Sequence, residues 1–225
     1  MRFVVVSSPG QGPHSHWSHA AAAAVGELLV AARHDVLWFV PMRTGGSLPP
    51  LPAGVELRGT TACRHKRLDQ VDADNSDLEL EALLAHSLRE HPADAVVHVG
   101  AGARGSPNVA WLAERMGSPA FVVTRASELV CHRGDLVDRD GQPCDRFLEP
   151  ERCRRCCATS WLRKPGAVAF QNRSDLLVAS LMAAEAVFVA TPAERTLLLA
   201  FGVPEALLVV GSEPAGIVAR VTARG

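Results

Sequence analysis

This sequence of 225 residues contains no tyrosine, and aromatic residues make up only 5% of it. Its formal net charge is −1, so it lacks the excess of basic residues expected of a protein that binds nucleic acid or anionic membranes. No apolar run approaches the roughly 20 residues needed to cross a bilayer. The alanine-rich stretch 20–32 is short and contains Gly26 and Glu27. The sequence therefore predicts no nucleic-acid partner and no membrane span.

The amino terminus also lacks the features of a secretory signal. Met1 and Arg2 lead directly into the apolar segment 3–6, which is too short for the apolar region of a signal and is followed by Pro9 and Gly10. We therefore expect a cytoplasmic protein. In that compartment cysteine thiols stay reduced and can bind metal ions.

Composition and patterning predict one α/β domain. Hydrophobic residues make up 48% of the chain and charged residues 21%, which is ordinary for a globular protein. Short β-branched segments alternate with helical patterns, as in doubly wound parallel sheets. We predict a single Rossmann-like domain over 1–225, with a mostly parallel sheet of six or seven strands, helices on both faces, and a cysteine-rich loop insertion. The predicted strands are 3–6, 34–40, 55–61, 94–99, 120–124, 186–190 and 207–210, and the main helices are 17–32, 106–117, 172–184 and 191–202.

Two capping boxes mark predicted helix starts. One begins at Ser76, before leucines at 80, 83, 84 and 88 that predict a single apolar stripe, and the other begins at Thr191, before Pro192. Gly117 and Gly202 are the predicted helix stops.

Five of the six cysteines lie in the polar stretch 131–157. Cys131, Cys144, Cys153 and Cys156 can meet around one ion if the stretch folds back on itself, and the last pair has C-x-x-C spacing. Thiolates suit tetrahedral zinc or an iron–sulfur cluster, and we favour structural zinc because four cysteines close its coordination sphere. Cys157 is an alternative fourth ligand. Disulfides in an exported protein, or unliganded thiols, are the competing interpretations.

A glycine loop follows the first predicted strand. Gly10, Gln11 and Gly12 suggest a dinucleotide fingerprint, but Ser15 stands where the third glycine should be. The second strand also runs out into Met42 with no acidic residue to hold a ribose. The loop is better interpreted as a place where a ligand or another chain approaches the backbone.

The same loop carries His14, His16 and His19. A loop at the carboxyl edge of a parallel sheet is where such folds bind ligands, so these side chains could hydrogen-bond substrate hydroxyls. His16 or His19 could then serve as a general base. A metal site and a solvated loop with no partner are the alternatives.

The chain resembles the amino-terminal half of family 4 glycosyltransferases, enzymes in which two Rossmann-like domains face each other across a cleft (the GT-B architecture). The resemblance rests on the order of elements, on the strand 96–100 ending in glycine, and on the closing pattern 187–204. It runs from Met1 to about Gly211. Its most specific part is the cysteine-rich stretch, which is similar to an insertion in a subset of these enzymes.

The resemblance implies that this domain binds the sugar acceptor, while a carboxyl-terminal domain binds the nucleotide-sugar donor. The loop 8–15, with Gly10, Gln11, Gly12 and His14, would sit over the donor phosphates and the acceptor. Relatives usually have a His-Asp pair six residues before the first cysteine, where this chain has Arg125 and Ala126. The acceptor-side base or polar contact of the relatives is therefore missing here. Arg125 stands in its place as a predicted substrate contact, and His16 and His19 are the candidate catalytic residues.

The sequence stops at Gly225, where the second domain of the family should begin. Sugar transfer needs a neutralised donor diphosphate as well as an aligned acceptor hydroxyl. We therefore expect one part of a split sugar transferase acting on a small-molecule or glycan acceptor, with a donor-domain subunit as partner. The alternative is a non-catalytic, zinc-containing binding or assembly protein. A hydrolase is a third interpretation, which no G-x-S-x-G motif supports. An uncovered cleft face also predicts a homo-oligomer.

Overall fold

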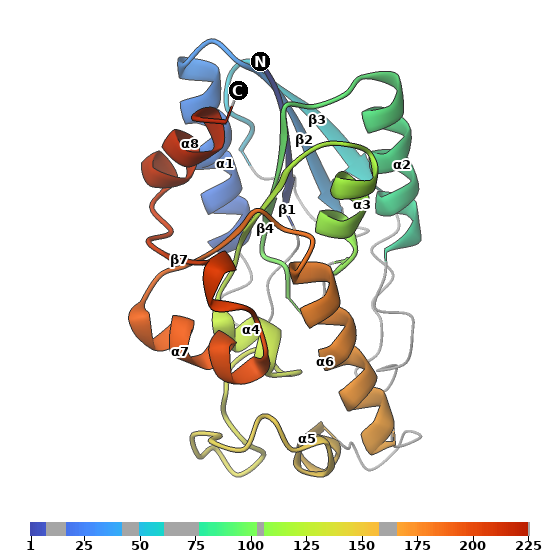
Figure 1. The fold of residues 1–225 in the computed structure, drawn as a ribbon, viewed down its shortest axis with the longest axis vertical. Helices are drawn as coiled ribbons and strands as arrows, with labels where there is room; N and C mark the ends of the chain where they lie inside the picture. Colours follow the sequence, from blue (N-terminus) through green and yellow to red (C-terminus); the bar gives the residue numbers. More distant parts are fainter. Residues whose placement is uncertain (8–16, 42–49, 61–76, 103–105, 158–165, 225) are drawn as a thin grey trace.

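The computed structural model of the chain describes residues 1–7, 17–41, 50–60, 77–102, 106–157 and 166–224. Its centre is a seven-stranded sheet with the order β3-β2-β1-β4-β5-β6-β7, in which every pairing between the named strands is parallel (Figure 1). The predicted α/β fold is confirmed. The strands are β1 (Arg2–Ser7), β2 (Asp35–Pro41), β3 (Val55–Thr60), β4 (Ala95–Val99), β5 (Ala120–Val123), β6 (Ala186–Val189) and β7 (Leu208–Val210).

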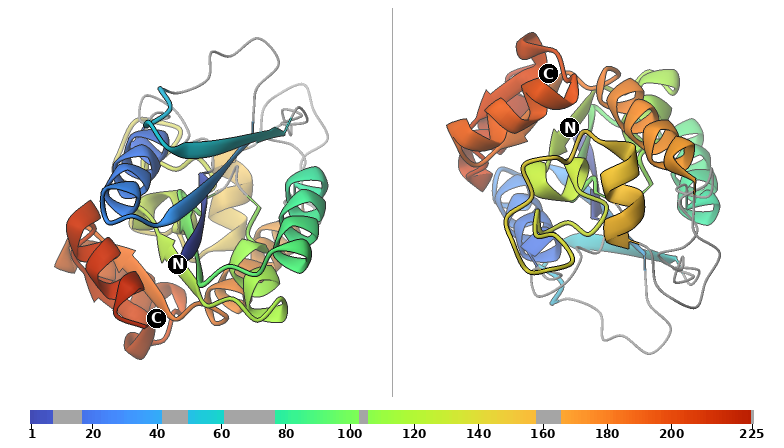
Figure 2. Two further views of the ribbon diagram at one scale, coloured as in Figure 1. Left: turned by 90° about the horizontal axis from the view of Figure 1, so that it is seen from above. Right: turned by 90° about the horizontal axis from the view of Figure 1, so that it is seen from below.

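Helices cover both faces of this sheet (Figure 2). α1 and α8 pack on one face, and α2, α3 and α6 pack on the other. The helices are α1 (Trp17–Ala31), α2 (Leu78–Glu90), α3 (Val109–Arg115), α4 (Ala126–Val130), α5 (Pro150–Cys157), α6 (Ala167–Leu181), α7 (Pro192–Phe201) and α8 (Pro214–Thr222), with a short 3-10 turn η2 (Glu205–Leu207) before β7.

Successive side chains of β1 point to opposite faces of the sheet, and those from Phe3 to Val6 are all apolar, so helices must pack on both faces. Phe3 and Val5 join the apolar cluster under α1 and α8, whereas Val4 and Val6 join the cluster under α2, α3 and α6. All four side chains are fully buried. A continuous β-branched run is typical of a strand that is buried on both sides, as the sequence predicted.

Local signals fix several helix ends. Thr191 and Glu194 form a complete capping box at the start of α7, and Gly202 ends that helix with φ 104°, a left-handed conformation that glycine adopts without strain. The box predicted at Ser76 is wrong in register, because Asp77 is the N-cap of α2 and accepts a hydrogen bond from the backbone N–H of Leu80. The apolar stripe of α2 is also narrower than predicted, since Leu83 is 40% exposed.

Three helices were not predicted. α4 and α5 lie next to or within the stretch interpreted as a loop, and α8 begins at Pro214, where proline fits the first helical turn. α4 and α5 lie at the carboxyl ends of the strands, at the bottom of Figure 1, and both chain termini lie at the opposite end. Among the described residues, no helix has the length and apolar character to cross a membrane.

Candidate functional site

The strand order reverses between β1 and β4, because the chain continues from β1 toward β3 on one side and from β4 toward β7 on the other. In open parallel sheets, ligands bind outside the carboxyl ends of the strands at such a reversal. Ser7 ends β1, and Gly100 follows β4 with φ 81°. Residues near these two positions are therefore the first place to look for a site.

His19 belongs to a hydrogen-bonded chain at the end of β1. Its Nδ1 lies 2.9 Å from Ser7 Oγ, which accepts a hydrogen bond of 2.9 Å from Trp38 Nε1. The indole can only donate, so the hydroxyl proton of the fully buried Ser7 is available to His19 Nδ1. That pattern favours the neutral tautomer with the proton on Nε2. Acting as a base through Nε2 would require the other tautomer, with Nδ1 donating to Ser7.

Glu128, on α4, places a buried carboxyl at the same edge. It is 3% exposed, and its Oε1 accepts a hydrogen bond of 2.6 Å from Trp17 Nε1. The guanidinium of Arg125 stacks over the Trp17 ring at 5.0 Å from its centroid. Burial raises the pKa of Glu128, while the Trp17 hydrogen bond and the charge of Arg125 oppose the rise and Glu194 adds to it. The site thus contains a carboxyl that is held in place but poorly solvated.

The absence of a side chain at Gly102 leaves space for the carboxyl group of Glu128. A Cβ atom built at Gly102 would lie 3.0 Å from Glu128 Cβ and 3.3 Å from Glu128 Oε2. Contacts this short are rare for real side chains, so glycine is needed where the chain leaving β4 passes α4. The second carboxyl oxygen therefore faces the backbone beside the reversal of strand order.

Glu194 fixes the start of α4 from another part of the chain. Its Oε1 accepts a hydrogen bond of 3.3 Å from the backbone N–H of Ala126, and its Oε2 accepts one of 2.8 Å from the N–H of Ala190. One carboxylate thus caps α7 and also satisfies an amide in the first turn of α4. Arg125, the predicted substrate contact, is the N-cap residue of α4 and owes its position to this arrangement.

The predicted site residues have different outcomes. His19 and Arg125 lie at the expected edge of the sheet, on α1 and at the start of α4. Gly10, Gln11, Gly12, His14 and His16 lie outside the described residues. Sequence reasoning missed Glu128 and its partner Trp17. The available signal was an acidic residue five positions after the end of β5, on a segment already expected to face the acceptor.

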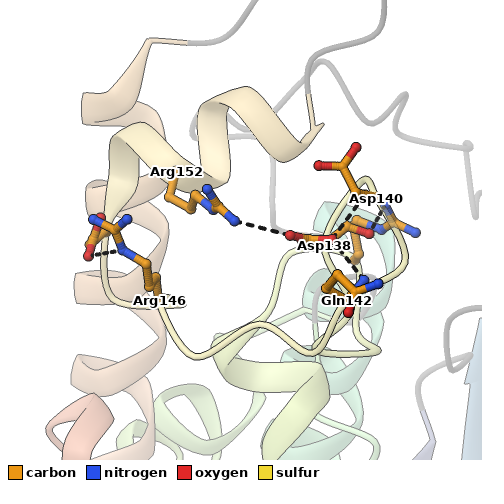
Figure 3. Close-up of polar contacts among 7 residues, drawn as sticks. Asp138, Asp140, Gln142, Arg146 and Arg152 are labelled. Atoms are coloured by element: carbon orange, nitrogen blue, oxygen red, sulfur yellow. Dashed lines mark hydrogen bonds and ion pairs between the residues drawn. The ribbon is translucent and has the colours of Figure 1, made fainter.

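The cysteine-rich segment 131–157 folds as turns followed by α5. Asp138 organises the turns: it accepts hydrogen bonds of 2.9 Å from the backbone N–H groups of Asp140 and Gln142 and a bond of 3.0 Å from Arg152 Nη2 (Figure 3). These contacts, led by the Gln142 amide, lower the pKa of Asp138. Arg146, also drawn in Figure 3, pairs with Glu149 at 2.6 Å. Polar contacts hold this segment where apolar side chains are few.

All five cysteines of the segment line one small cavity of about 20 Å³. Burial raises the pKa of Cys153 to about 11, and Cys131, Cys144 and Cys156 add to the rise. Those three neighbours are the other three predicted ligands. Burial also raises the pKa of Cys157 to about 12, and this side chain packs with Cys153 against Ala169 and Phe170 of α6. The fold thus brings the predicted thiols to one place.

The sulfur atoms of these cysteines are chemically suitable zinc ligands, but the side chains are not arranged as a zinc site. They are soft donors, and all five are free cysteines. Within the described ranges, however, no group of three or more His, Cys, Asp or Glu side chains has the arrangement of a metal site. Zinc at Cys131, Cys144, Cys153 and Cys156 stays a prediction.

A cation from the body of the domain reaches this cluster. Arg173 on α6 is 5% exposed, and its Nη2 donates a hydrogen bond of 3.4 Å to the main-chain oxygen of Glu128. Burial lowers the pKa of Arg173 to about 10, and Cys131, Cys153 and Cys157 oppose that shift. Arg173 and Cys153 also line a second cavity of about 90 Å³, between the segment and the ends of α6 and α7.

No family model matches the chain, and no curated protein matches it. Solved structures do resemble it, and their set includes GT-B glycosyltransferases and epimerases. Anabaena HepE in complex with UDP-glucose is 11% identical with a TM-score of 0.49, over 93% of this chain and 43% of that one. UDP-N-acetylglucosamine 2-epimerase from Rickettsia bellii is 14% identical with a TM-score of 0.46, over 99% and 47%. The C-terminal domain of the coenzyme A biosynthesis protein CoaBC is 10% identical with a TM-score of 0.38, over 55% and 63%.

The chain spans less than two thirds of the length of each of these three proteins. At such identities and TM-scores the likeness concerns the arrangement of a parallel α/β sheet and carries no argument about activity.

Proposed function

We propose that this chain is a ligand-binding domain of the glycosyltransferase acceptor type, which holds a hydroxylated small molecule or a glycan at the carboxyl edge of its sheet. The single observation that carries the proposal is the buried carboxyl of Glu128 beside Gly102, at the reversal of strand order. A binding edge at that place is what the parallel topology favours. The sequence resemblance supplies the class of ligand.

The chemistry of the edge suits hydroxyl groups. A partly desolvated carboxylate is a strong hydrogen-bond acceptor, and a raised pKa brings it closer to that of an effective general base. Trp17 fixes the orientation of the carboxyl, and Arg125 adds planar donors next to it. Glu128 would therefore accept the proton of an acceptor hydroxyl, with Arg125 as an orienting contact.

The proposed role of zinc is structural. Cys131, Cys144, Cys153 and Cys156 would hold it, and the closed set of four thiolates would leave no open coordination position for substrate. The metal would supply the force that orders a polar segment, because α5 contributes no buried residue of its own. The segment starts at the end of α4, so ordering it would also steady Glu128.

Sugar transfer requires a donor site that the described residues do not show, so we propose that another domain or polypeptide supplies it at the same edge. The thiol cluster specifically favours a second candidate, a zinc-containing binding or assembly protein without turnover. Both candidates need the acceptor-type ligand at Glu128. They differ in whether a nucleotide sugar is consumed when a donor-binding partner is added.

The test is saccharide binding to Glu128→Gln, with Glu90→Gln as the control. Glutamine keeps an oxygen for the Trp17 indole and removes the charge, whereas Glu90 is an exposed residue at the end of α2. A panel of mono- and disaccharides, with UDP-glucose alongside, is screened by saturation-transfer NMR, and hits are measured by calorimetry. We expect saccharide binding that Glu128→Gln weakens at least tenfold and Glu90→Gln leaves unchanged.

The charge of Glu128 does not stabilise the folded state at neutral pH. A carboxyl whose pKa is raised on folding stabilises the protein only below its unfolded pKa, and that contribution is lost as the pH rises through the folded value. Loss of this charge should therefore not by itself destabilise the variant at neutral pH, and its melting temperature is measured beside the wild type. A saccharide that binds equally well to Glu128→Gln, or no saccharide binding by the wild type, would overturn the proposal.

A further inference from the structure

The cavity of about 90 Å³ between the cysteine-rich segment and the ends of α6 and α7 has a buried cation in its wall. This cation is Arg173, on α6, which is only 5% exposed. Its guanidinium stays charged at neutral pH and carries five N–H donors. Among the described residues, its one hydrogen bond runs from Nη2 to the main-chain oxygen of Glu128 at 3.4 Å, which is longer than most N–H···O bonds. Most of its donors therefore find no acceptor in this part of the chain.

Arg173 also has no carboxylate partner within the described ranges, since none of the ion pairs found there includes it. The acidic residue nearest to it in the sequence, Asp175, is exposed and accepts a hydrogen bond of 2.8 Å from Gln171. Burying a charge is costly unless a counter-charge and hydrogen bonds compensate it. An anion that enters the cavity would supply both.

The rest of the cavity wall is mainly apolar. Val130 at the end of α4, Phe170 on α6 and Phe201 at the end of α7 line it and are buried. Phe147 of the cysteine-rich segment lines it too, and this ring packs against the core cluster to which Val130 and Phe201 belong. Apolar walls with a single charged group are typical of sites for small molecules. This wall suits a ligand with one anionic end and a short hydrocarbon part.

The volume of the cavity and the charge at its exposed side restrict the ligand further. One water molecule needs roughly 10–15 Å³ of such a cavity, so about 90 Å³ admits a carboxylate with a chain of about two to four carbon atoms. Asp175 also lines the cavity, and its negative charge would repel a second negative charge on the ligand. A monocarboxylate therefore fits better than a dicarboxylate or a phosphate dianion.

We propose that this cavity is a binding site for a small aliphatic monocarboxylate, whose carboxylate pairs with Arg173 and whose hydrocarbon chain packs against Phe170 and Phe201. A guanidinium can hold a carboxylate through two parallel N–H···O bonds, which are stronger than bonds between neutral groups. Of the described residues that line the cavity, none is Trp17, Arg125 or Glu128. The site is thus distinct from the saccharide edge, and it requires no metal ion.

The experiment titrates four small molecules into the isotope-labelled protein at neutral pH and follows binding in its amide NMR spectrum. Butyrate is the expected ligand, butyramide has its shape without the charge, and succinate and inorganic phosphate test the limit of one negative charge.

The same titrations are repeated on four variants, and the melting temperature of each variant reports whether it folds. Arg173→Met removes the charge, Arg173→Lys keeps the charge without the paired donors, and Ser174→Met fills the cavity from a half-buried position in its wall. Arg58→Met is the matched control, because Arg58 lies on β3 with a side chain that is 62% exposed.

We expect the wild type to bind butyrate, and to bind butyramide at least tenfold more weakly because the amide carries no charge for Arg173. Succinate and phosphate should also bind more weakly than butyrate. Arg173→Met should weaken butyrate binding at least tenfold and should bind butyrate and butyramide alike, a loss of discrimination that a merely structural role of Arg173 would not produce. Arg173→Lys should keep part of the preference for butyrate. Ser174→Met should weaken the binding of both ligands, and Arg58→Met should match the wild type.

The proposal is wrong if the wild type binds no butyrate or binds butyramide as tightly. Butyrate binding that is unchanged in Arg173→Met or in Ser174→Met places the ligand elsewhere and also overturns it. Succinate or phosphate binding as tight as that of butyrate overturns the choice of a monocarboxylate. If Arg173→Met does not fold, Ser174→Met and the comparison of butyrate with butyramide in the wild type decide. None of these measurements depends on zinc or on saccharide binding at Glu128.

Discussion

The sheet and the cysteine-rich segment 131–157 owe their order to different forces. Strands β4 and β5 are buried along their entire length, whereas α5 has no buried residue. In the sheet, each buried Val, Phe or Leu contributes about 1.5–3 kcal/mol through the loss of water contact. The segment relies on turns, half-exposed ion pairs and thiols, and exposed ion pairs contribute only about 0–1 kcal/mol each. One region should therefore survive removal of a metal, and the other should not.

The largest effect should come from the sheet and should not depend on metal. Phe188 on β6 is 1% exposed and packs under α1 and α8, so Phe188→Ala should lower the free energy of unfolding by about 3–5 kcal/mol. Leu148, in the segment, is 50% exposed, and Leu148→Ala should change stability by less than about 0.5 kcal/mol. Urea denaturation with and without chelator measures both. A Phe188→Ala effect that disappears in the stripped protein would contradict this division.

The second-largest effect is expected in the cysteine-rich segment, where it distinguishes the predicted zinc ligands from Cys157. If the proposed zinc orders this region, Cys153→Ser should abolish zinc uptake and lower the stability of the zinc-loaded protein by several kcal/mol. Cys157→Ser is the matched control and should keep about one zinc per chain, since Cys157 packs against Ala169 and Phe170. Elemental analysis and thermal melting give the answer. Loss of zinc from Cys157→Ser, with Cys156→Ser unaffected, would move the fourth ligand from Cys156 to Cys157.

A smaller effect is expected in the pH dependence of stability, through a buried histidine of the sheet. His98 on β4 is 1% exposed, and burial lowers its pKa from 6.5 to about 3. The unfolded chain then binds a proton near pH 6.5 and the folded chain does not, so stability falls as the pH drops from about 6.5 toward 3. At pH 5 the loss from this group is about 2 kcal/mol.

Urea denaturation at pH 7 and pH 5 measures this loss, with His98→Gln as the comparison. The glutamine variant has its own cost, but its stability should depend less on pH by about 2 kcal/mol over this interval. Parallel pH profiles of the two proteins would mean that His98 is protonated in the folded state, and that the sheet interior admits charge.

Sequence patterns predicted the sheet well because its forces are local and repetitive. The continuous apolar run Phe3 to Val6 is by itself typical of a strand buried on both faces. The capping box at Thr191 can be recognised from four consecutive residues. The same patterns gave no sign of α5, because its arginines and cysteines resemble a polar loop. They also placed the α2 cap one residue early, where Ser76 and Asp77 both fit an N-cap.

The site was harder to predict because its contacts join distant parts of the chain. Trp17 and Glu128 are 111 residues apart, and Arg173 and Glu128 are 45 apart. No spacing rule connects such residues before the strand order is known. The meeting of the cysteines was easier to predict, because their spacing is visible within one segment and the fold had only to bring Cys131 and Cys144 to α5. Their role as zinc ligands stays a prediction. Arg125 lies at the edge where the substrate contact was predicted, its role there stays a prediction, and its stacking on Trp17 was not foreseen.

The double role of Glu194 has a consequence for how the protein is made. The amide of Ala126 donates its hydrogen bond to the carboxylate of Glu194, which lies 68 residues later in the chain. During synthesis, Trp17, Glu128 and the five clustered cysteines are therefore all made before Glu194, the residue that fixes the start of α4. It follows that the surroundings of Glu128 are completed late, after β6 has joined the sheet and α7 has formed. Until then, the first amide of α4 lacks the carboxylate that accepts its hydrogen bond.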